Sequence, residues 1–210
     1  MNSLIRKTIS LTAVALLLGT AFSGHQSSAQ QSENESAAFQ PIIESEMPEG
    51  FPDPTPVGEV EVKSYPVYRK AESGGGFWTL FMHIKKKDIP MTAPVELDYN
   101  PGESESYREG NMSFLYGDPE WGKAGQDGRV EVADVPEMTV VSIGVRGRRS
   151  NSTVAAAHAR IEEWLEENIE QYSSAGELRV MAYNSPFVPE RNRYFEVQVP
   201  IQSNEANEAE

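Results

Sequence analysis

The sequence predicts an α+β domain in which antiparallel strands form a distorted barrel with two helices. Candidate strands and helices follow one another twice in the order strand–helix–strand–strand. Each such unit has to bury one face of a helix and one face of a sheet, which favours antiparallel sheets. Two units can close on each other and leave a ligand-binding cleft between them. The chain has 210 residues, enough for one such domain and terminal extensions.

Residues 1–29 have the composition of a secretory signal peptide. Arg6 and Lys7 precede an apolar run from Ile9 to Leu18, and small residues follow up to Ala29. The run is short for a membrane span, which favours a cleaved signal peptide over the alternative, an uncleaved anchor. The chain contains no cysteine, which excludes a lipid anchor on cysteine, disulfide bonds and thiolate metal sites. We therefore expect a secreted or periplasmic protein without stable membrane insertion after cleavage.

The regions on either side of the predicted domain are polar and acidic. Residues 30–57 are also rich in proline and predict a disordered linker, and residues 201–210 predict a disordered tail. The folded domain is thus expected over residues 58–200. The formal net charge of the chain is −14, so binding to nucleic acid is not expected.

The first unit begins with a predicted strand over residues 59–71, in which Pro66 marks a bulge or an edge. The glycine-rich stretch 72–76 interrupts the chain. An amphipathic helix is expected over 77–86, with its core face formed by Phe77, Leu80, Phe81 and Ile84. Two strands, over residues 91–100 and 111–117, complete the unit.

In the first of these two strands, acidic and apolar residues alternate. Glu96 and Asp98 alternate with Val95, Leu97 and Tyr99. Since successive side chains of a strand point to opposite faces, this pattern predicts a half-exposed strand with its carboxylates directed outward.

The second unit repeats the order with different sequences. Residues 137–147 are rich in β-branched side chains and predict a strand. A long helix follows over 150–172, with Ser150 or Ser152 as its N-cap and His158 within its apolar stripe, where a hydrogen-bonded core histidine is expected. Two further strands are expected over residues 177–184 and 193–200.

Four segments of the chain, in this order, resemble the SOUL haem-binding protein family. They are the helix GFWTLFMHI at 76–84, the motif IPMTAPV at 89–95, the strand MSFLYG at 112–117 and the closing segment AYNSPFVPERNRYFEVQV at 182–199. The resemblance covers about residues 58–199, and the predicted signal peptide suggests an exported, bacterial-type member. It implies a distorted barrel built from two strand–helix–strand–strand halves, related to gyrase-inhibitor-like effector domains. It also implies non-catalytic binding of haem or a similar tetrapyrrole.

Haem requires an apolar slot, cations for its propionates and, optionally, an axial donor to iron. His83 is the candidate iron ligand because His25 lies in the predicted signal peptide and His158 in a core stripe. Trp78 and Met82 lie, like His83, away from the predicted core face of the first helix, as expected for a ligand-facing helix. The candidate cofactor-binding residues are His83, Trp78, Met82, Met91, Arg69 and Arg179, the two arginines as partners of anionic groups.

Two other functions remain open at this point, and no catalytic residue is predicted. A hydrolase-like enzyme acting on a small lipophilic compound would use a cleft carboxylate with a raised pKa. A tethered interaction module would carry a large exposed apolar patch outside the cleft. The sequence contains no Gly-x-Ser-x-Gly elbow, His-Glu-x-x-His motif or phosphate-binding loop. The expected partner is therefore a small-molecule ligand.

Overall fold

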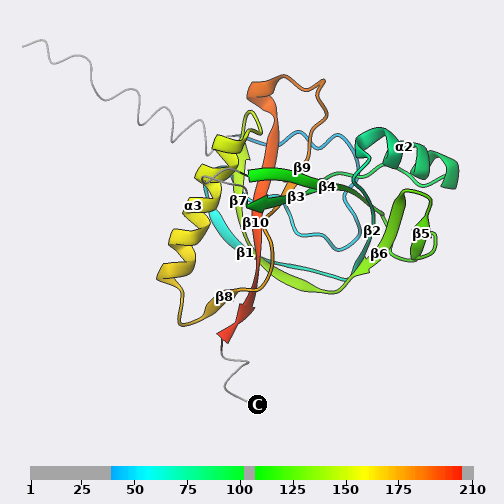
Figure 1. Ribbon diagram of the computed structural model, residues 1–210. Coiled ribbons are helices and arrows are strands. Elements are labelled where there is room, and N and C mark those ends of the chain that lie inside the picture. The colour runs from blue at the N-terminus through cyan, green and yellow to red at the C-terminus, as the bar shows by residue number, and fades with distance from the viewer. Residues whose placement is uncertain (1–38, 102–106, 205–210) are drawn as a thin grey trace, which may run out of the picture.

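The computed structural model describes residues 39–101 and 107–204, which form one antiparallel sheet with two α-helices packed on it (Figure 1). The predicted signal peptide lies outside the described residues, as do residues 30–38 of the predicted linker and 205–210 of the predicted tail. In chain order the elements are β1 (Val60–Tyr65), β2 (Tyr68–Ser73), α2 (Gly76–Lys87), β3 (Val95–Pro101), β4 (Tyr107–Leu115), β5 (Gly125–Asp127), β6 (Val130–Val135), β7 (Met138–Arg146), α3 (Asn151–Glu167), β8 (Tyr172–Ser174), β9 (Arg179–Ala182), the 3-10 helix η1 (Glu190–Asn192) and β10 (Tyr194–Ser203).

The sheet contains the two predicted strand–helix–strand–strand units. Its strand order is β1-β7-β10-β9-β3-β4-β2-β6-β5, and β8 pairs with β10 beside this path. The first unit contributes β3-β4-β2 and the second contributes β9-β10-β7, so each has the same internal order. The units meet where β3 pairs with β9. This arrangement confirms the α+β class and its two-unit construction.

The sheet does not close into the predicted barrel. Within the described residues, β1 pairs with β7 at one end and β5 pairs with β6 at the other, and no ladder joins β1 to β5. The sheet is therefore open. The predicted distorted barrel is corrected to a curved open sheet of the same antiparallel class.

Pro66 divides the predicted first strand into two. β1 ends at Tyr65 and pairs with β7 of the second unit, whereas β2 begins at Tyr68 and pairs with β4 and β6. Proline has no backbone N–H to give to a ladder, which suits a position between two strands. The chain thus crosses from one unit to the other within two residues.

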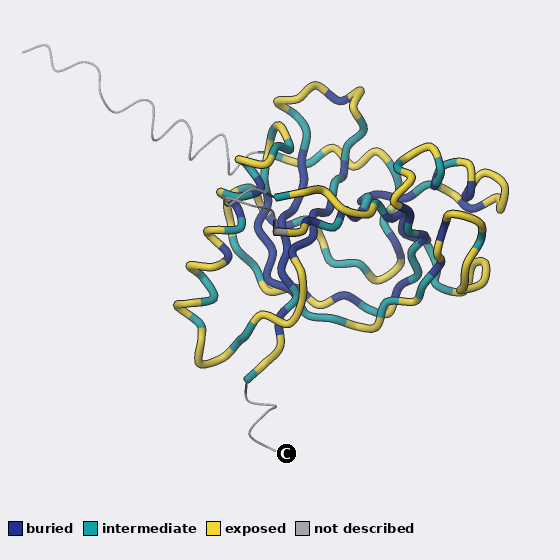
Figure 2. Tube along the Cα trace, viewed as in Figure 1, coloured by how far each residue is buried: buried dark blue, intermediate teal, exposed yellow. Residues whose placement is uncertain are grey.

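Helix α3 covers the outer face of the second unit. The Ser150 side chain accepts a hydrogen bond from the backbone N–H of Thr153, which confirms the predicted N-cap. Val154, Ala157 and Ile161 are buried in one core cluster with side chains of β7, β9 and β10. Figure 2 shows these central strands as long buried stretches. The apolar stripe of the helix is therefore what holds it on the sheet.

Helix α2 covers the outer face of the first unit, but its buried side differs from the prediction. Leu80, His83 and Ile84 are buried, while Phe77 is 41% exposed. The buried face of the helix is thus rotated toward His83. Its apolar members pack on a separate core cluster that includes Phe114 of β4.

Residues 39–57, here called the N-terminal strap, lie against the sheet (Figure 1, blue). The backbone N–H of Glu49 donates to the carbonyl of Gly117, and that of Ala93 donates to the carbonyl of Glu46. The Glu44 carboxylate accepts hydrogen bonds from Ser185. For this stretch the structure differs from the disorder that its composition predicts, because its backbone groups are paired with loops of the domain.

Candidate functional site

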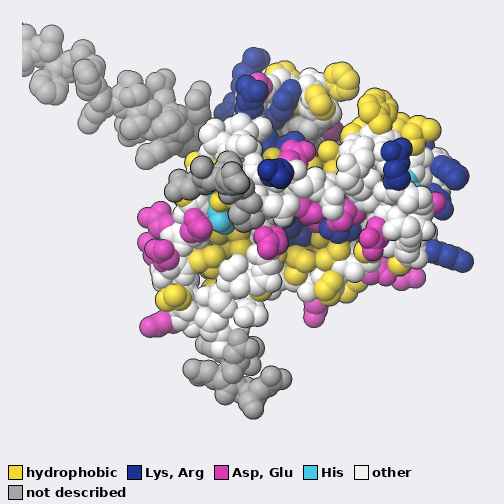
Figure 3. Space-filling model, in the orientation of Figure 1, with side chains coloured by type: hydrophobic (Ala, Val, Ile, Leu, Met, Phe, Trp, Pro, Cys, Tyr) yellow, Lys and Arg dark blue, Asp and Glu magenta, His cyan; other side chains and the backbone are white. Residues whose placement is uncertain are grey.

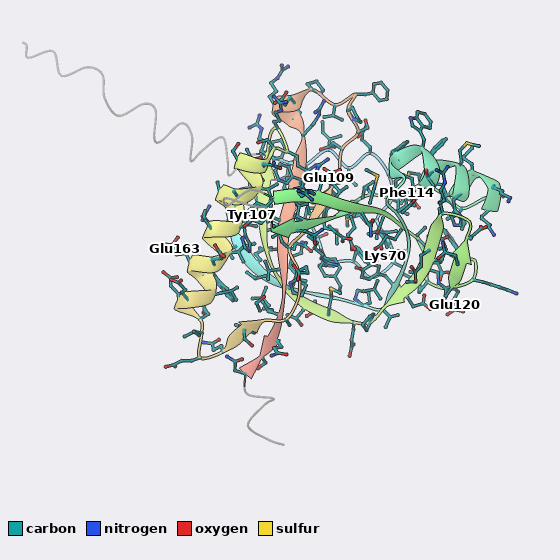
Figure 4. All side chains as sticks on the ribbon, viewed as in Figure 1. Lys70, Tyr107, Glu109, Phe114, Glu120 and Glu163 are labelled. Atoms are coloured by element: carbon teal, nitrogen blue, oxygen red, sulfur yellow. The ribbon has the colours of Figure 1, made fainter. Side chains whose placement is uncertain are left out.

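A polar network lies on the inner face of the sheet, opposite the faces covered by α2 and α3. It joins β1, β2, β3, β7, β9 and β10 by side-chain hydrogen bonds and ion pairs, and Figure 4 shows its Lys70 inside the curve of the sheet. Its members are Thr55, Lys63, Tyr65, Tyr68, Lys70, Glu96, Ser142, Arg179, Tyr183, Tyr194, Glu196 and Gln198.

Glu96 is the centre of the half of this network nearer the first unit. Its carboxylate lies 2.7 Å from Lys70 Nζ and 3.2 Å from Arg179 Nη1, and it accepts a hydrogen bond from the Tyr68 hydroxyl at 2.8 Å. Burial of the carboxyl opposes its ionisation, but the positive charges of Arg179 and Lys70 outweigh burial and lower the pKa of Glu96. This carboxylate is ionised and fully occupied by partners within the protein.

Glu196 is the centre of the other half. Its carboxylate lies 2.7 Å from Lys63 Nζ and accepts hydrogen bonds from the Tyr183 hydroxyl, at 3.1 Å, and from Gln198 Nε2, at 2.7 Å. The backbone N–H of Thr55, from the N-terminal strap, donates to the same carboxylate. Buried charges of this kind are tolerated only when they are paired and hydrogen-bonded, as both glutamates are.

The sequence prediction for Glu96 was wrong. It was expected on an outward face of its strand, but its exposed fraction is 3%. Leu97 and Tyr99, on the other face of β3, belong to the core cluster that includes α3. The alternation along this strand alone therefore predicted that Glu96 faces solvent. The sequence of β3 alone carries no signal for this burial, because the partners of Glu96 come from β2 and β9.

Helix α2 carries an apolar surface, here called the aromatic patch of α2, formed by the exposed Phe77, Trp78 and Met82 together with the half-buried Phe81. Trp78 is 72% and Met82 is 64% exposed. The Phe77 and Phe81 rings stack at 5.7 Å between centroids, and the Trp78 ring contacts both edge-on. Figure 3 shows apolar side chains gathered over this helix. The structure thus keeps Trp78 and Met82 together on one accessible surface.

The same helix ends in a run of positive charge. Lys85, Lys86 and Lys87 form its last turn, and all three are exposed. Cations at this end of a helix are favoured by the helix dipole. They also place ammonium groups within one or two turns of the aromatic patch.

His83 lies on the buried side of α2, not on the side of Trp78 and Met82. Its Nε2 is 3.0 Å from the Tyr116 hydroxyl, and its Nδ1 is 3.3 Å from an oxygen of Asp127. Burial lowers the pKa of His83, although the charge of Asp127 opposes this. Because both ring nitrogens have protein partners, this arrangement does not fit an axial ligand to iron.

The other three predicted residues occupy separate places. Met91 packs at the edge of the core cluster beneath α2. Arg69 makes two hydrogen bonds to Asp134, of 2.7 and 2.9 Å, on the outer side of β2. Arg179 belongs to the inner network. The structure therefore does not assemble the six predicted residues into one site.

Neither metal-binding clusters nor membrane-spanning helices are found in the described ranges. Within residues 39–101 and 107–204, no group of three or more His, Cys, Asp or Glu side chains could hold a metal ion. No helix in these ranges is long and apolar enough to cross a membrane.

Comparison with solved structures supports the fold. The EcmrR–DNA complex matches with a TM-score of 0.52 at 14% identity over 69% of this chain, which corresponds to 57% of that one. A protein described as an uncharacterized conserved protein from Listeria innocua matches with a TM-score of 0.51 at 11% identity, over 70% of this chain and 94% of that one. A hydrolase from Listeria innocua has a TM-score of 0.50 at 10% identity, over 71% and 94%. At these identities the likeness concerns the fold alone.

The fold and the strand order define a two-unit α+β protein with an open antiparallel sheet. The sequence profile of the SOUL heme-binding protein family matches residues 53–200, and the chain belongs to this family. No curated protein matches the chain in a sequence comparison.

Proposed function

We propose that this protein binds haem or a related flat tetrapyrrole, without converting it, on the aromatic patch of α2. The observation that carries the proposal is the exposure of Trp78 and Met82 beside Phe77 on a helix that ends in three lysines. Membership of the SOUL family supports the class of ligand. The exposed aromatic patch supports α2 as the place of binding.

The physical fit rests on shape and charge. Exposed aromatic rings offer flat faces and edges for contact with a macrocycle, and contiguous exposed apolar surface marks a binding site more often than a random surface does. The propionates of a tetrapyrrole are anionic, and Lys85 and Lys86 supply point charges for them, while Lys87 already pairs with Asp127 at 3.0 Å. The inner network fits a tetrapyrrole less well, because its lysines and carboxylates are already paired with one another.

A haem would bring an iron centre to this surface, and the patch offers one sulfur donor to it. Met82 is 64% exposed and belongs to the patch, whereas His83 faces the protein interior. The proposed binding therefore rests on apolar contact and propionate pairing, with Met82 as the axial candidate.

The hydrolase alternative receives no support from Glu96, the buried carboxylate nearest the junction of the two units. A general acid would need a raised pKa, but the pKa of Glu96 is lowered and the carboxylate is held by Lys70 and Arg179. We therefore place the ligand-binding proposal first.

We also propose that the protein is exported, on the support of the basic and apolar pattern of residues 1–29. The mass of the protein recovered from its native host tests this. Cleavage near Ala29 supports export, and an intact amino terminus in a cytoplasmic fraction opposes it.

Titration of the purified protein with hemin tests the ligand proposal. We expect a saturable Soret change in the parent protein and about tenfold weaker binding in Trp78→Ala, from the loss of one aromatic contact and its buried area. A Lys85→Gln/Lys86→Gln/Lys87→Gln variant should also bind more weakly, with a smaller dependence on salt. The matched control is Ile169→Ala, another exposed apolar side chain, which follows α3 and is 67% exposed. Equal affinity in Trp78→Ala and Ile169→Ala would overturn the proposed place of binding.

A further inference from the structure

The N-terminal strap inserts an aromatic side chain into the inner face of the sheet. The Phe51 ring packs edge-on against Tyr65, with 4.9 Å between centroids, and against Tyr68, with 5.3 Å. Tyr65 ends β1 and Tyr68 begins β2, so Phe51 sits where the chain crosses between the two units. Both tyrosines are buried and belong to the inner network.

The strap is also hydrogen-bonded to the network four residues later. The Thr55 hydroxyl donates to Ser142 at 3.0 Å, and the Thr55 carbonyl accepts from the Tyr194 hydroxyl at 2.5 Å. Thr55 itself is fully buried. The strap therefore occupies the inner face as a ligand would, with an aromatic ring and a set of backbone hydrogen bonds.

One buried group of the network is left without a partner. Arg179 is 5% exposed, and its Nη2 is buried with no hydrogen-bond partner among the described residues. Its guanidinium lies over the Tyr65 ring at 4.9 Å from the centroid, and its Nη1 donates to the Tyr68 hydroxyl. Arg179, which carries the unpaired donor, thus contacts both tyrosines against which Phe51 packs. Burying a donor without a partner costs free energy, so an acceptor bound at this position would stabilise the folded protein.

The family profile covers the network but only the last residues of the strap. The SOUL profile begins at residue 53, so the inner network from Thr55 onward lies within the matched range. Phe51 and the preceding residues of the strap lie before it. The inner face is therefore part of the family fold, while the aromatic plug comes from the segment in front of it.

We propose that the inner face is a second ligand site, specific for a small neutral aromatic molecule with one hydrogen-bond acceptor, and that Phe51 fills its aromatic slot. The ring of such a ligand replaces Phe51 against Tyr65 and Tyr68, and its acceptor takes the free N–H of Arg179 Nη2. The strap leaves the site when the ligand enters, since both cannot occupy it.

The charges around the site favour a neutral ligand over an anionic one. Its cations are already matched by carboxylates, because Lys63 pairs with Glu196, and Lys70 and Arg179 pair with Glu96. Lys70 contacts Glu72 as well. An added carboxylate would lie close to Glu96 without a cation of its own, at a cost in desolvation.

Benzamide is a suitable probe, with benzoate as its charged counterpart. Calorimetric titration of the full chain should show that Phe51→Ala binds benzamide about tenfold more tightly than the parent, because only the fraction of parent molecules whose strap is open can bind it. Benzoate should bind more weakly than benzamide to the same variant. The matched control is Phe187→Ala, which removes a phenylalanine that is 95% exposed and should behave as the parent. Equal benzamide affinity in Phe51→Ala and Phe187→Ala overturns the proposal, as does tighter binding of benzoate.

Amide hydrogen exchange of the parent chain provides a test that needs no variant. The Thr55 N–H donates to Glu196 and the Glu49 N–H donates to Gly117. Saturating benzamide should accelerate exchange at both amides, since it displaces the strap. Binding that leaves both rates unchanged would show that benzamide binds elsewhere. Hemin takes no part in either experiment, so their outcome is independent of the patch on α2.

Discussion

Glu96 of β3 and Glu196 of β10 lie opposite the same residue, Met181 of β9, one on each side of that strand. Each carboxylate receives a lysine from one of the first two strands, Lys70 of β2 or Lys63 of β1. The two carboxylates therefore flank β9, the strand through which the second unit meets the first.

We expect Glu96→Gln to lower the free energy of unfolding by about 3–5 kcal/mol, because it leaves Arg179 buried without a carboxylate and Lys70 with Glu72 alone. Urea denaturation measures the change. Glu131→Gln is the matched control, since Glu131 is exposed on β6 and its substitution should stay within about 0.5 kcal/mol. Losses of similar size in the two variants would contradict a structural role for the buried pair.

Stability should fall in acid through the same carboxyl group. The pKa of Glu96 is lowered from its ordinary value of 4.5, so its contribution is present above pH 4.5 and is lost as the pH falls toward the folded-state pKa. We expect the urea midpoint of the parent to decrease steadily below about pH 4.5, and that of Glu96→Gln to decrease less. Parallel pH profiles for the two proteins would show that other groups govern acid unfolding.

His83→Gln should leave the Soret maximum of a hemin complex unchanged. Both ring nitrogens of His83 face Tyr116 and Asp127 rather than the aromatic patch. The variant should lose about 1–2 kcal/mol of stability from the disturbed buried hydrogen bond. Absorbance spectra and urea denaturation separate the two effects. A displaced Soret band at unchanged affinity would instead identify His83 as an iron ligand.

Gly144→Ala should loosen the N-terminal strap. A Cβ on Gly144 would lie 2.2 Å from the carbonyl oxygen of Thr55 and 2.6 Å from that of Pro56, so the strap backbone would have to move. We expect a loss of about 1–3 kcal/mol, as for an overpacked core, and faster exchange of the Gly58 N–H, which donates to the Gly144 carbonyl.

Gly74→Ala serves as the control for this substitution. Its added Cβ would meet only the end of the Asn111 side chain, at 3.3 Å. Exchange at Gly58 should therefore remain at the parent rate. An unchanged rate in Gly144→Ala as well would mean that the strap is not held by this close contact.

Much of the fold could be predicted from sequence because its signals are local. The β-branched run of β7, the Ser150 cap and the apolar stripe of α3 each reflect contacts within a few residues or with one neighbouring face. The strands β5 and β6 were missed, and so was β8. β5 and β8 have three residues each, too few to show a period.

The candidate site was harder to predict because it depends on contacts between distant segments. Glu96 alternates with apolar residues as an outward-facing residue would, and the partners that bury it come from β2 and β9. The helical wheel of α2 placed His83 off the predicted core face, but its inward partners are Tyr116 and Asp127, more than thirty residues later. Alternation and helical period do not encode such pairings.

The position of β10 has a consequence for how the chain reaches this structure. β10 lies between β7 and β9, and its Glu196 holds Thr55 of the strap, 141 residues earlier in the sequence. Contacts of such separation require closure of long loops, which slows folding. While β10 is still inside the ribosome, β7 and β9 lack the strand that lies between them. The second unit should therefore acquire its native pairing only after synthesis of residues 194–203, and the first and last described segments should become protected from exchange in the same late step.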